Sequence, residues 1–145
     1  MKTTGETDQF LKSSTLEQFN QYLTGDYTSE YRDLADYLNR YIASHPNLSV
    51  PQIIKDSLLN RNYAYQILNG QRKNPSRNHL IPLCMAMHMD LDETNRALKI
   101  GKSGTLYSKE KRDALIILCI HQKQYDLMKV NELLYEHGFD LFLKD

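Results

Sequence analysis

Few residues of this sequence are spaced as a catalytic site requires. The five histidines are scattered, and His79 and His88 lie too far apart to form the i, i+4 pair of a metal-binding helix. Asp90, Asp92 and Glu93 fall in the first turn of an expected helix, where capping and the helix dipole already account for acidic residues. Glycine-rich phosphate loops, the zinc-protease motif and the serine-hydrolase motif are all missing from the chain. We therefore expect no enzyme activity, no bound metal and no cofactor.

Positive charge is concentrated in the middle of the chain. The 145 residues carry 18 Lys and Arg against 18 Asp and Glu, a formal net charge of zero. Residues 1–47 have 4 basic and 7 acidic side chains, residues 48–113 have 11 and 6, and residues 114–145 have 3 and 5. Between Lys55 and His79 there are five basic residues and one acidic residue. This local excess of positive charge is typical of a surface that faces phosphate groups.

The composition is that of one folded domain, with 41% hydrophobic and 25% charged residues. The longest apolar run, 114–120, is far shorter than the roughly 20 residues of a membrane helix. The first residues lack the apolar stretch of a secretion signal. We therefore expect a cytoplasmic protein that does not enter a membrane. Cys84 and Cys119 are isolated from each other and from histidine pairs, so we expect two buried thiols.

Apolar residues recur at helical spacing along most of the chain, which predicts an all-α fold. The clearest stripe, from Tyr31 to Ile42, predicts a helix over 29–44. Residues 1–13 are polar and aperiodic, so we expect a mobile arm there, followed by a short helix over 14–25. Further helices are expected behind N-cap residues at Ser49, Asn60, Ser76, Asp90 and Ser108, and a last one over 127–137.

The later helices carry three hydrophobic features. Pro82 lies inside one helix, where it should bend or weaken the preceding turn. The run 114–120 is apolar on every face, so we expect it to be buried. Phe139, Leu141 and Phe142 follow the last helix and are expected to close on it as a hydrophobic clasp.

Two helix pairs are similar in sequence. Residues 80–85 match residues 115–120 at an offset of 35, and residues 91–98 match residues 127–134 at an offset of 36. Duplication of one helix pair would explain this similarity. The alternative is that any two amphipathic helix pairs align this well, and the sequence leaves both explanations open.

The middle of the chain has the pattern of a helix-turn-helix: a capped helix, a short turn, and a second short helix that ends in Asn-Gly. The run that carries it reads Tyr63-x-x-x-Ile67-x-Asn69-Gly70-x-Arg72-x-x-Pro75-Ser76, preceded by Leu48-Ser49-x-x-Gln52-Ile53 and followed by Leu80 to Met87 and Leu91-Asp92-Glu93. In these residues the sequence resembles the lambda-repressor/Cro-like, or Xre-type, family over about half its length. The resemblance implies a five-helix DNA-binding domain over 28–104. Residues 1–27 would then be an N-terminal arm and short helix, and residues 105–145 a C-terminal helical hairpin packed on the domain.

The resemblance also implies roles for individual residues, because the second helix of the family's motif enters the major groove. By position, Arg61, Asn62 and Gln66 would read base edges, Arg pairing with guanine and Asn or Gln with adenine, and Tyr65 would add a phosphate or thymine-methyl contact. The phosphate backbone would be held by Asn69, Gln71, Arg72, Lys73 and Arg77, helped by the amides at the helix start at Val50. The alternative for Arg61, Asn62 and Gln66 is a solvated helix face. Ala64, Ile67 and Ile53 are expected in the core.

Three positions depart from the family's pattern. Leu58 stands in the turn where Gly is usual, so either the turn has another shape or a left-handed Leu costs about 1 kcal/mol or more. Ile54 replaces a small residue early in the motif. Val50-Pro51 replaces the polar pair that often supports the second helix, so one usual contact to DNA is missing.

These observations predict a sequence-specific transcriptional regulator, a repressor or autoregulator, that binds a double-stranded DNA operator as a homodimer. The tyrosine-rich helix at 29–44 or the clasp at 139–143 would form the dimer interface. The alternative function is a protein-interaction adaptor that keeps the fold without binding DNA. Its protein partner would bind through the tyrosine-rich or the C-terminal helices.

Overall fold

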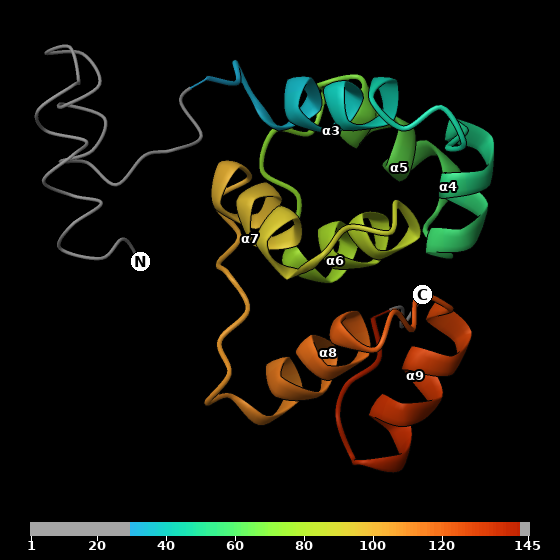
Figure 1. Ribbon diagram of the computed structural model, residues 1–145, viewed down its shortest axis with the longest axis vertical. Helices are drawn as coiled ribbons and strands as arrows, with labels where there is room; N and C mark the ends of the chain where they lie inside the picture. The colour runs from blue at the N-terminus through green and yellow to red at the C-terminus, as the bar shows by residue number, and fades with distance from the viewer. Residues whose placement is uncertain (1–29, 143–145) are drawn as a thin grey trace, which may run out of the picture. The chain divides into compact units, whose positions relative to one another are not determined.

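The computed structural model describes residues 30–142, and the regular structure of that part of the chain is entirely helical (Figure 1). The helices are α3 Leu34–Ala43, α4 Val50–Ser57, α5 Arg61–Leu68, α6 Arg77–Ala86, α7 Leu91–Ile100, α8 Lys111–His121 and α9 Leu127–Glu136. The all-α prediction is therefore confirmed for these residues. The arm expected over 1–13 and the helix expected over 14–25 lie outside the described residues. Compact units divide at Glu30, and all seven described helices belong to the unit that begins at Tyr31.

Local side-chain hydrogen bonds explain why several helices begin where the sequence predicts. Asn60 accepts the N–H of Tyr63 at 3.1 Å and starts α5. Asp90 and Glu93 form a complete capping box at the start of α7, with distances of 2.8 and 2.9 Å. At the start of α4, Ser49 accepts the backbone N–H of Gln52 at 3.3 Å.

Two helix starts differ from the prediction, and in both a carboxylate forms the cap. Helix α3 begins at Leu34 and not at 29, because Asp33 accepts the backbone N–H of Asp36. Helix α8 is capped by Glu110, which accepts the backbone N–H of Asp113 at 2.6 Å, so the expectation that Ser108 caps this helix is wrong. Ionised carboxylates accept stronger hydrogen bonds than hydroxyls, and their negative charge interacts favourably with the positive N-terminal end of the helix dipole.

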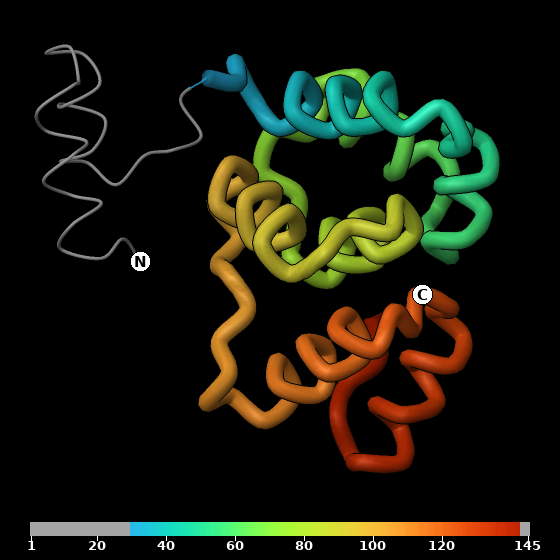
Figure 2. The backbone as a smooth tube through the Cα atoms, in the orientation of Figure 1, coloured from blue at the N-terminus to red at the C-terminus, as the bar shows by residue number. Residues whose placement is uncertain are grey.

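Helix α6 forms the centre of the core and packs against α4, α7 and α9 (Figure 2). Its residues 80–86 are all buried, including Pro82, as expected for a helix that is apolar on every side. Ser76 stands at the N-cap of α6, but its hydroxyl bonds the Nδ1 of His79 at 2.6 Å and makes no capping bond. Cys84, in the same helix, and Cys119, in α8, are both buried thiols, as predicted.

The expectation that α8 is buried on every face is wrong. Ile116, Cys119 and Ile120 are buried, but Leu118 is 49% exposed. Helices α7 and α9 pack against α8 and cover only part of its circumference. The clasp after α9 does close: Phe142 is buried, and its N–H donates to the side-chain oxygen of Asn131 at 3.1 Å.

The helix pairs α6–α7 and α8–α9 share specific hydrogen bonds as well as sequence. Asn95 accepts the N–H of Leu106 at 2.8 Å, and Asn131, 36 residues later, accepts the N–H of Phe142. The turns also correspond, with left-handed residues at His88 (φ 59°) and Lys123 (φ 57°) after the first helix of each pair. The two pairs are therefore built alike, down to the residue that ties the following loop to the second helix.

Candidate nucleic-acid interface

The connection between α4 and α5 is short and internally bonded. Ser57 donates its hydroxyl to the carbonyl of Ile54 at 2.7 Å and accepts the N–H of Leu59 at 3.2 Å. Between them, Leu58 adopts the left-handed conformation (φ 62°, ψ 10°). Of the two possibilities given above, a turn of another shape or a left-handed Leu, the structure has the second. Because Leu carries a Cβ, this conformation costs about 1 kcal/mol or more relative to an ordinary helical one. The turn therefore keeps the shape that Gly usually allows, with Leu in place.

Helix α5 has one buried face and one polar face. Ala64 and Ile67 are completely buried and Leu68 nearly so, and Ile53 of α4 lies in the same core, as expected. On the opposite face, four residues at the start and middle of the helix face outward: Arg61 and Asn62 are exposed, and Tyr65 and Gln66 are half-buried. The structure thus brings together the four residues expected to read bases.

Arg61 and Tyr65 form one side of this face. The Arg61 guanidinium carbon lies 5.6 Å from the centre of the Tyr65 ring, a cation–π distance. Both residues border a hollow of about 410 Å³ that is also lined by Lys55 of α4 and by Leu58. Lys55 is exposed and adds positive charge beside Arg61. Lys55 belongs to the basic stretch between Lys55 and His79, but the resemblance assigns it no contact with DNA.

Gln66 is held by a residue beyond the end of its helix. Arg72 Nε donates to Gln66 Oε1 at 2.7 Å, and the backbone N–H of Arg72 donates to the carbonyl of Gln66 at 3.0 Å. The Arg72 guanidinium also lies over the Tyr63 ring at 4.0 Å, and Tyr63 stacks on His79 at 4.0 Å. Since a guanidinium only donates hydrogen bonds, the Gln66 atom that faces it must be the oxygen. The orientation of the Gln66 amide is therefore fixed.

The loop after α5 is shaped by its own polar side chains. Asn69 accepts the backbone N–H of Gln71 at 2.9 Å, and Asn69 Nδ2 donates to the Gln71 side-chain oxygen at 3.3 Å. Gly70 has a φ of +88°, which a side chain would make unfavourable. Gln71, Arg72 and Lys73 are all exposed on this loop. The loop therefore presents two cations directly after the polar face of α5.

Arg77 does not belong to that cationic surface. Its two terminal nitrogens donate to the two carboxylate oxygens of Asp113 at 2.9 and 3.0 Å, and one also donates to the carbonyl of Thr105. Burial alone would raise the pKa of Asp113, but the hydrogen bonds from Arg77 and from the N–H of Tyr107 hold that pKa below its usual value. Arg77 thus joins α6 to α8, and we leave it out of the phosphate contacts.

The start of α4 offers less to an anion than the sequence analysis expected. Pro51 has no N–H, and the N–H of Gln52 is already donated to Ser49. Val50 and Pro51 stand where a polar pair often supports the second helix of the motif. Gln52, the next residue, could supply a polar group for α5, but its side-chain amide donates to Asp56 at 2.8 Å. In this structure Gln66 is held instead by Arg72, from the loop after α5. No pattern in the sequence identifies this contact, because it depends on how the loop turns.

Within residues 30–142, no group of three or more His, Cys, Asp or Glu side chains is arranged to hold a metal ion. None of the described helices is long and apolar enough to cross a membrane. A scan of family models and searches of curated proteins and of solved structures found no match to the chain.

Proposed function

We propose that the chain is a helix-turn-helix transcriptional regulator, a repressor or autoregulator, which binds double-stranded DNA with α5 in the major groove. The single observation that carries this proposal is the polar face of α5, where Arg61, Asn62, Tyr65 and Gln66 lie together and Gln66 has a fixed amide. A major groove about 12 Å wide admits one α-helix, and these side chains match the hydrogen-bonding groups of base edges.

Electrostatics support the same surface. The chain has no carboxylate between Asp56 and Asp90, and Arg61, Arg72 and Lys73 are all exposed in that interval. Lysine and arginine contacts to phosphate account for most non-specific affinity for DNA. Because the whole chain has a formal net charge of zero, attraction to unrelated DNA should be weak. The preferred sequence would then be distinguished mainly by the base contacts of α5.

A homodimer on a two-fold symmetric operator remains part of the proposal. Of the two dimer surfaces considered above, the clasp is largely used inside the chain, because Phe142 is buried and Arg112 lies over its ring at 5.0 Å. On α3, Tyr37 is buried and donates its hydroxyl to the carbonyl of Glu93 at 2.9 Å. Tyr31, just before α3, and Tyr41, on α3, are half-buried, so this segment keeps partly uncovered aromatic surface.

The experiment that tests this function is selection of duplexes from a random library by the full chain, followed by anisotropy titrations at several salt concentrations. We expect an enriched sequence whose affinity exceeds that of a shuffled duplex and falls steeply with added salt. Asn62→Ala should weaken binding to the enriched duplex about tenfold, the loss of roughly 1–3 kcal/mol for one good base contact. Arg61→Ala should weaken it further, whereas Lys129→Ala, which removes the same charge from α9, should not. An unenriched library, or equal losses for Arg61→Ala and Lys129→Ala, would reject the proposal.

A further inference from the structure

Helix α9 exposes apolar side chains that the fold does not use. Within the described part of the chain, five large hydrophobic side chains are exposed, and three of them line one hollow: Leu58, Met128 and Tyr135. Met128 is 64% and Tyr135 is 76% exposed. They are seven residues apart, so they lie on the same face of α9, about 10 Å apart along its axis. A surface helix normally turns polar residues to solvent at such positions.

Leu58 provides a second, independent observation. It is held in the left-handed conformation, and its side chain is 37% exposed. Glycine would adopt this conformation without strain, and a polar residue would be better solvated. Strained residues persist where another requirement selects them, and they cluster at binding and switch sites. A Leu that is both strained and exposed is explained if its side chain binds something outside this fold.

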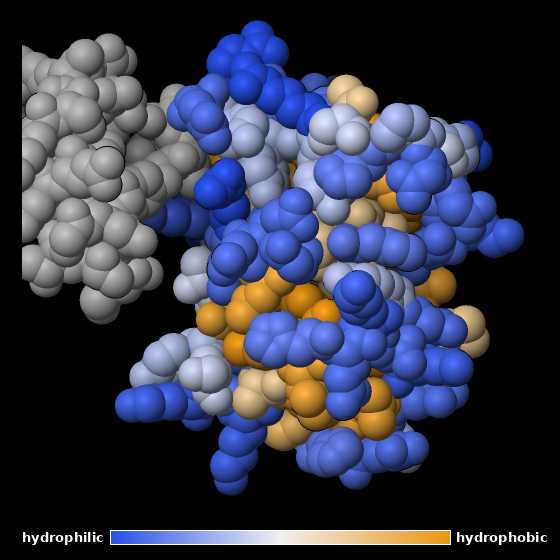
Figure 3. Space-filling model, viewed as in Figure 1, coloured by the Kyte–Doolittle hydropathy of each residue, from blue (hydrophilic) through white to orange (hydrophobic). Residues whose placement is uncertain are grey.

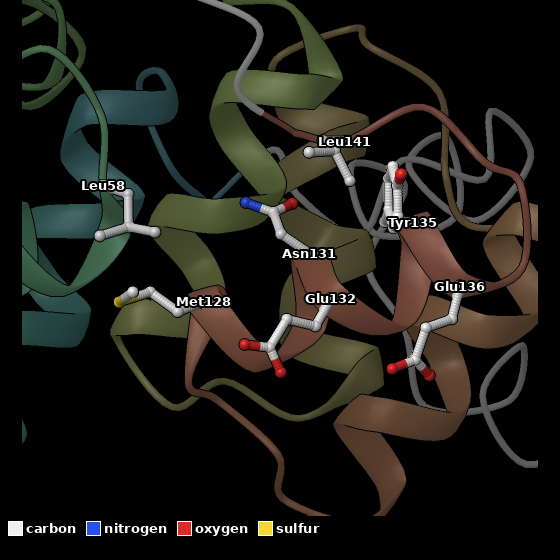
Figure 4. A pocket seen from close by; sticks show the side chains of 7 residues that line it. All are labelled: Leu58, Met128, Asn131, Glu132, Tyr135, Glu136 and Leu141. Carbon is white, nitrogen blue, oxygen red and sulfur yellow. The ribbon is translucent and has the colours of Figure 1, made fainter.

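The hollow is large enough to take a few side chains of a partner. Its volume is about 410 Å³, and Asn131, Glu132, Glu136 and Leu141 complete its lining. Leu58 and Met128 stand at one end and Tyr135 at the other (Figure 4). On the face of the molecule seen in Figure 3, hydrophobic residues gather over α8 and just above it, whereas the surface over α3 is mostly hydrophilic.

Charge identifies the kind of partner. Glu132 and Glu136 follow one edge of the groove, and residues 114–142 as a whole carry two basic and four acidic side chains. A second copy of the chain fits poorly, because antiparallel pairing of Met128 with Tyr135 would place the two Glu132 carboxylates together at the two-fold axis. Like charges in such contact are unfavourable. A partner with cations beside its apolar side chains would be attracted instead.

We propose that the groove between Leu58, Met128 and Tyr135 binds a short amphipathic helix of another protein. The helix inserts apolar side chains one to two turns apart and places Lys or Arg beside Glu132 and Glu136. This inference goes beyond DNA binding and does not depend on it. Leu58 also borders the hollow beside Arg61 and Tyr65, but the other lining residues of the groove lie on or after α9, and the test uses no DNA.

Methionine methyl groups give a direct test on the full chain. The probe is a 16-residue helical peptide of leucine and lysine, with leucine on one face, and the control peptide replaces every lysine by glutamate. With ¹³C-methyl methionine, the Met128 signal should shift and saturate with the lysine peptide, while the buried Met85, Met87 and Met89 stay in place. No shift at Met128, or equal affinity for the glutamate peptide, would overturn the proposal.

Variants then locate the site. Tyr135→Ser should weaken binding of the lysine peptide at least tenfold, and the double variant Glu132→Gln with Glu136→Gln should weaken it several-fold. Asp92→Asn, which removes an exposed carboxylate of α7, should leave it unchanged. If sedimentation shows a dimer of the free chain that Tyr135→Ser converts to a monomer, the groove binds a second copy and the proposal is wrong.

Leu58→Gly separates binding from folding. We expect this variant to melt at the same or a higher temperature, because glycine relieves the left-handed strain, and to bind the lysine peptide several-fold more weakly. A lower melting temperature with unchanged peptide affinity would show that Leu58 serves the fold alone and would remove the second observation on which the proposal stands.

Discussion

Replacing Arg72 by lysine should change the base preference of the protein more than its overall affinity for DNA. Lysine keeps the positive charge for phosphate but lacks the planar group that both stacks on Tyr63 and donates to Gln66 at 2.7 Å. Without that donor, the Gln66 amide is free to rotate before it binds DNA. Ordering one such side chain costs about 0.5–1.5 kcal/mol, so discrimination at the base pair that Gln66 reads should fall about fivefold.

The measurement is anisotropy with the preferred duplex and with each single base-pair variant of it. For Arg72→Lys we expect the affinity ratio to shrink at one position and to stay constant at the others. Lys73→Ala is the matched comparison, because it removes a charge from the same loop and should weaken binding to every duplex alike, with a smaller salt dependence.

A double-mutant cycle with Gln66→Ala isolates the contact. If Arg72 acts through Gln66, Arg72→Lys should have no further effect on discrimination once Gln66 is Ala. Equal loss of affinity on all duplexes, or additive effects of the two substitutions on discrimination, would refute the reasoning and make Arg72 a phosphate contact only.

Three further predictions concern stability. Asp113→Ala should destabilise the fold by about 2–4 kcal/mol in urea unfolding, because it leaves the partly buried Arg77 without its carboxylate, while Asp92→Asn should change stability little. Because the folded pKa of Asp113 lies below the unfolded one, its contribution is complete above the usual aspartate pKa and is lost as the pH falls through the folded value; Asp113→Asn should therefore flatten the acid limb of a stability–pH curve. Asp90→Ala removes one arm of a capping box and should cost about 1 kcal/mol in the same urea assay, whereas an unchanged midpoint would show that α7 is held by packing alone.

The helices could be predicted from the sequence because their boundaries depend on residues that are close together in the chain. The prediction is most accurate where a polar N-cap residue precedes a stripe of apolar residues. Helix α5 begins and ends at the predicted residues, because Asn60 caps it and Gly70 allows the chain to leave it. The start of α8 was missed, because Ser108 is of a type that often caps helices and Glu is not, whereas the capping bond is accepted by Glu110.

The candidate site could be predicted less completely. Residues on one helix, such as Arg61 and Gln66, share a face by spacing alone, and the structure brings them together. Contacts between distant residues leave no such signal: Arg77 and Asp113 are 36 positions apart, and a basic residue near a phosphate-binding pattern looks the same whether it faces DNA or a carboxylate. The contact between Arg72 and Gln66 depends on a loop that turns back on its helix.

The ion pair between Arg77 and Asp113 also limits where the chain can be truncated. A fragment ending near residue 104, the boundary that the helix-turn-helix resemblance implies, would keep Arg77 and lose the carboxylate that neutralises it. The same cut would uncover the side of α6 on which α9 packs. Truncation to the minimal DNA-binding region should therefore yield an aggregation-prone fragment. Residues 31–142 are the shortest fragment that we expect to fold and to be suitable for mutational study.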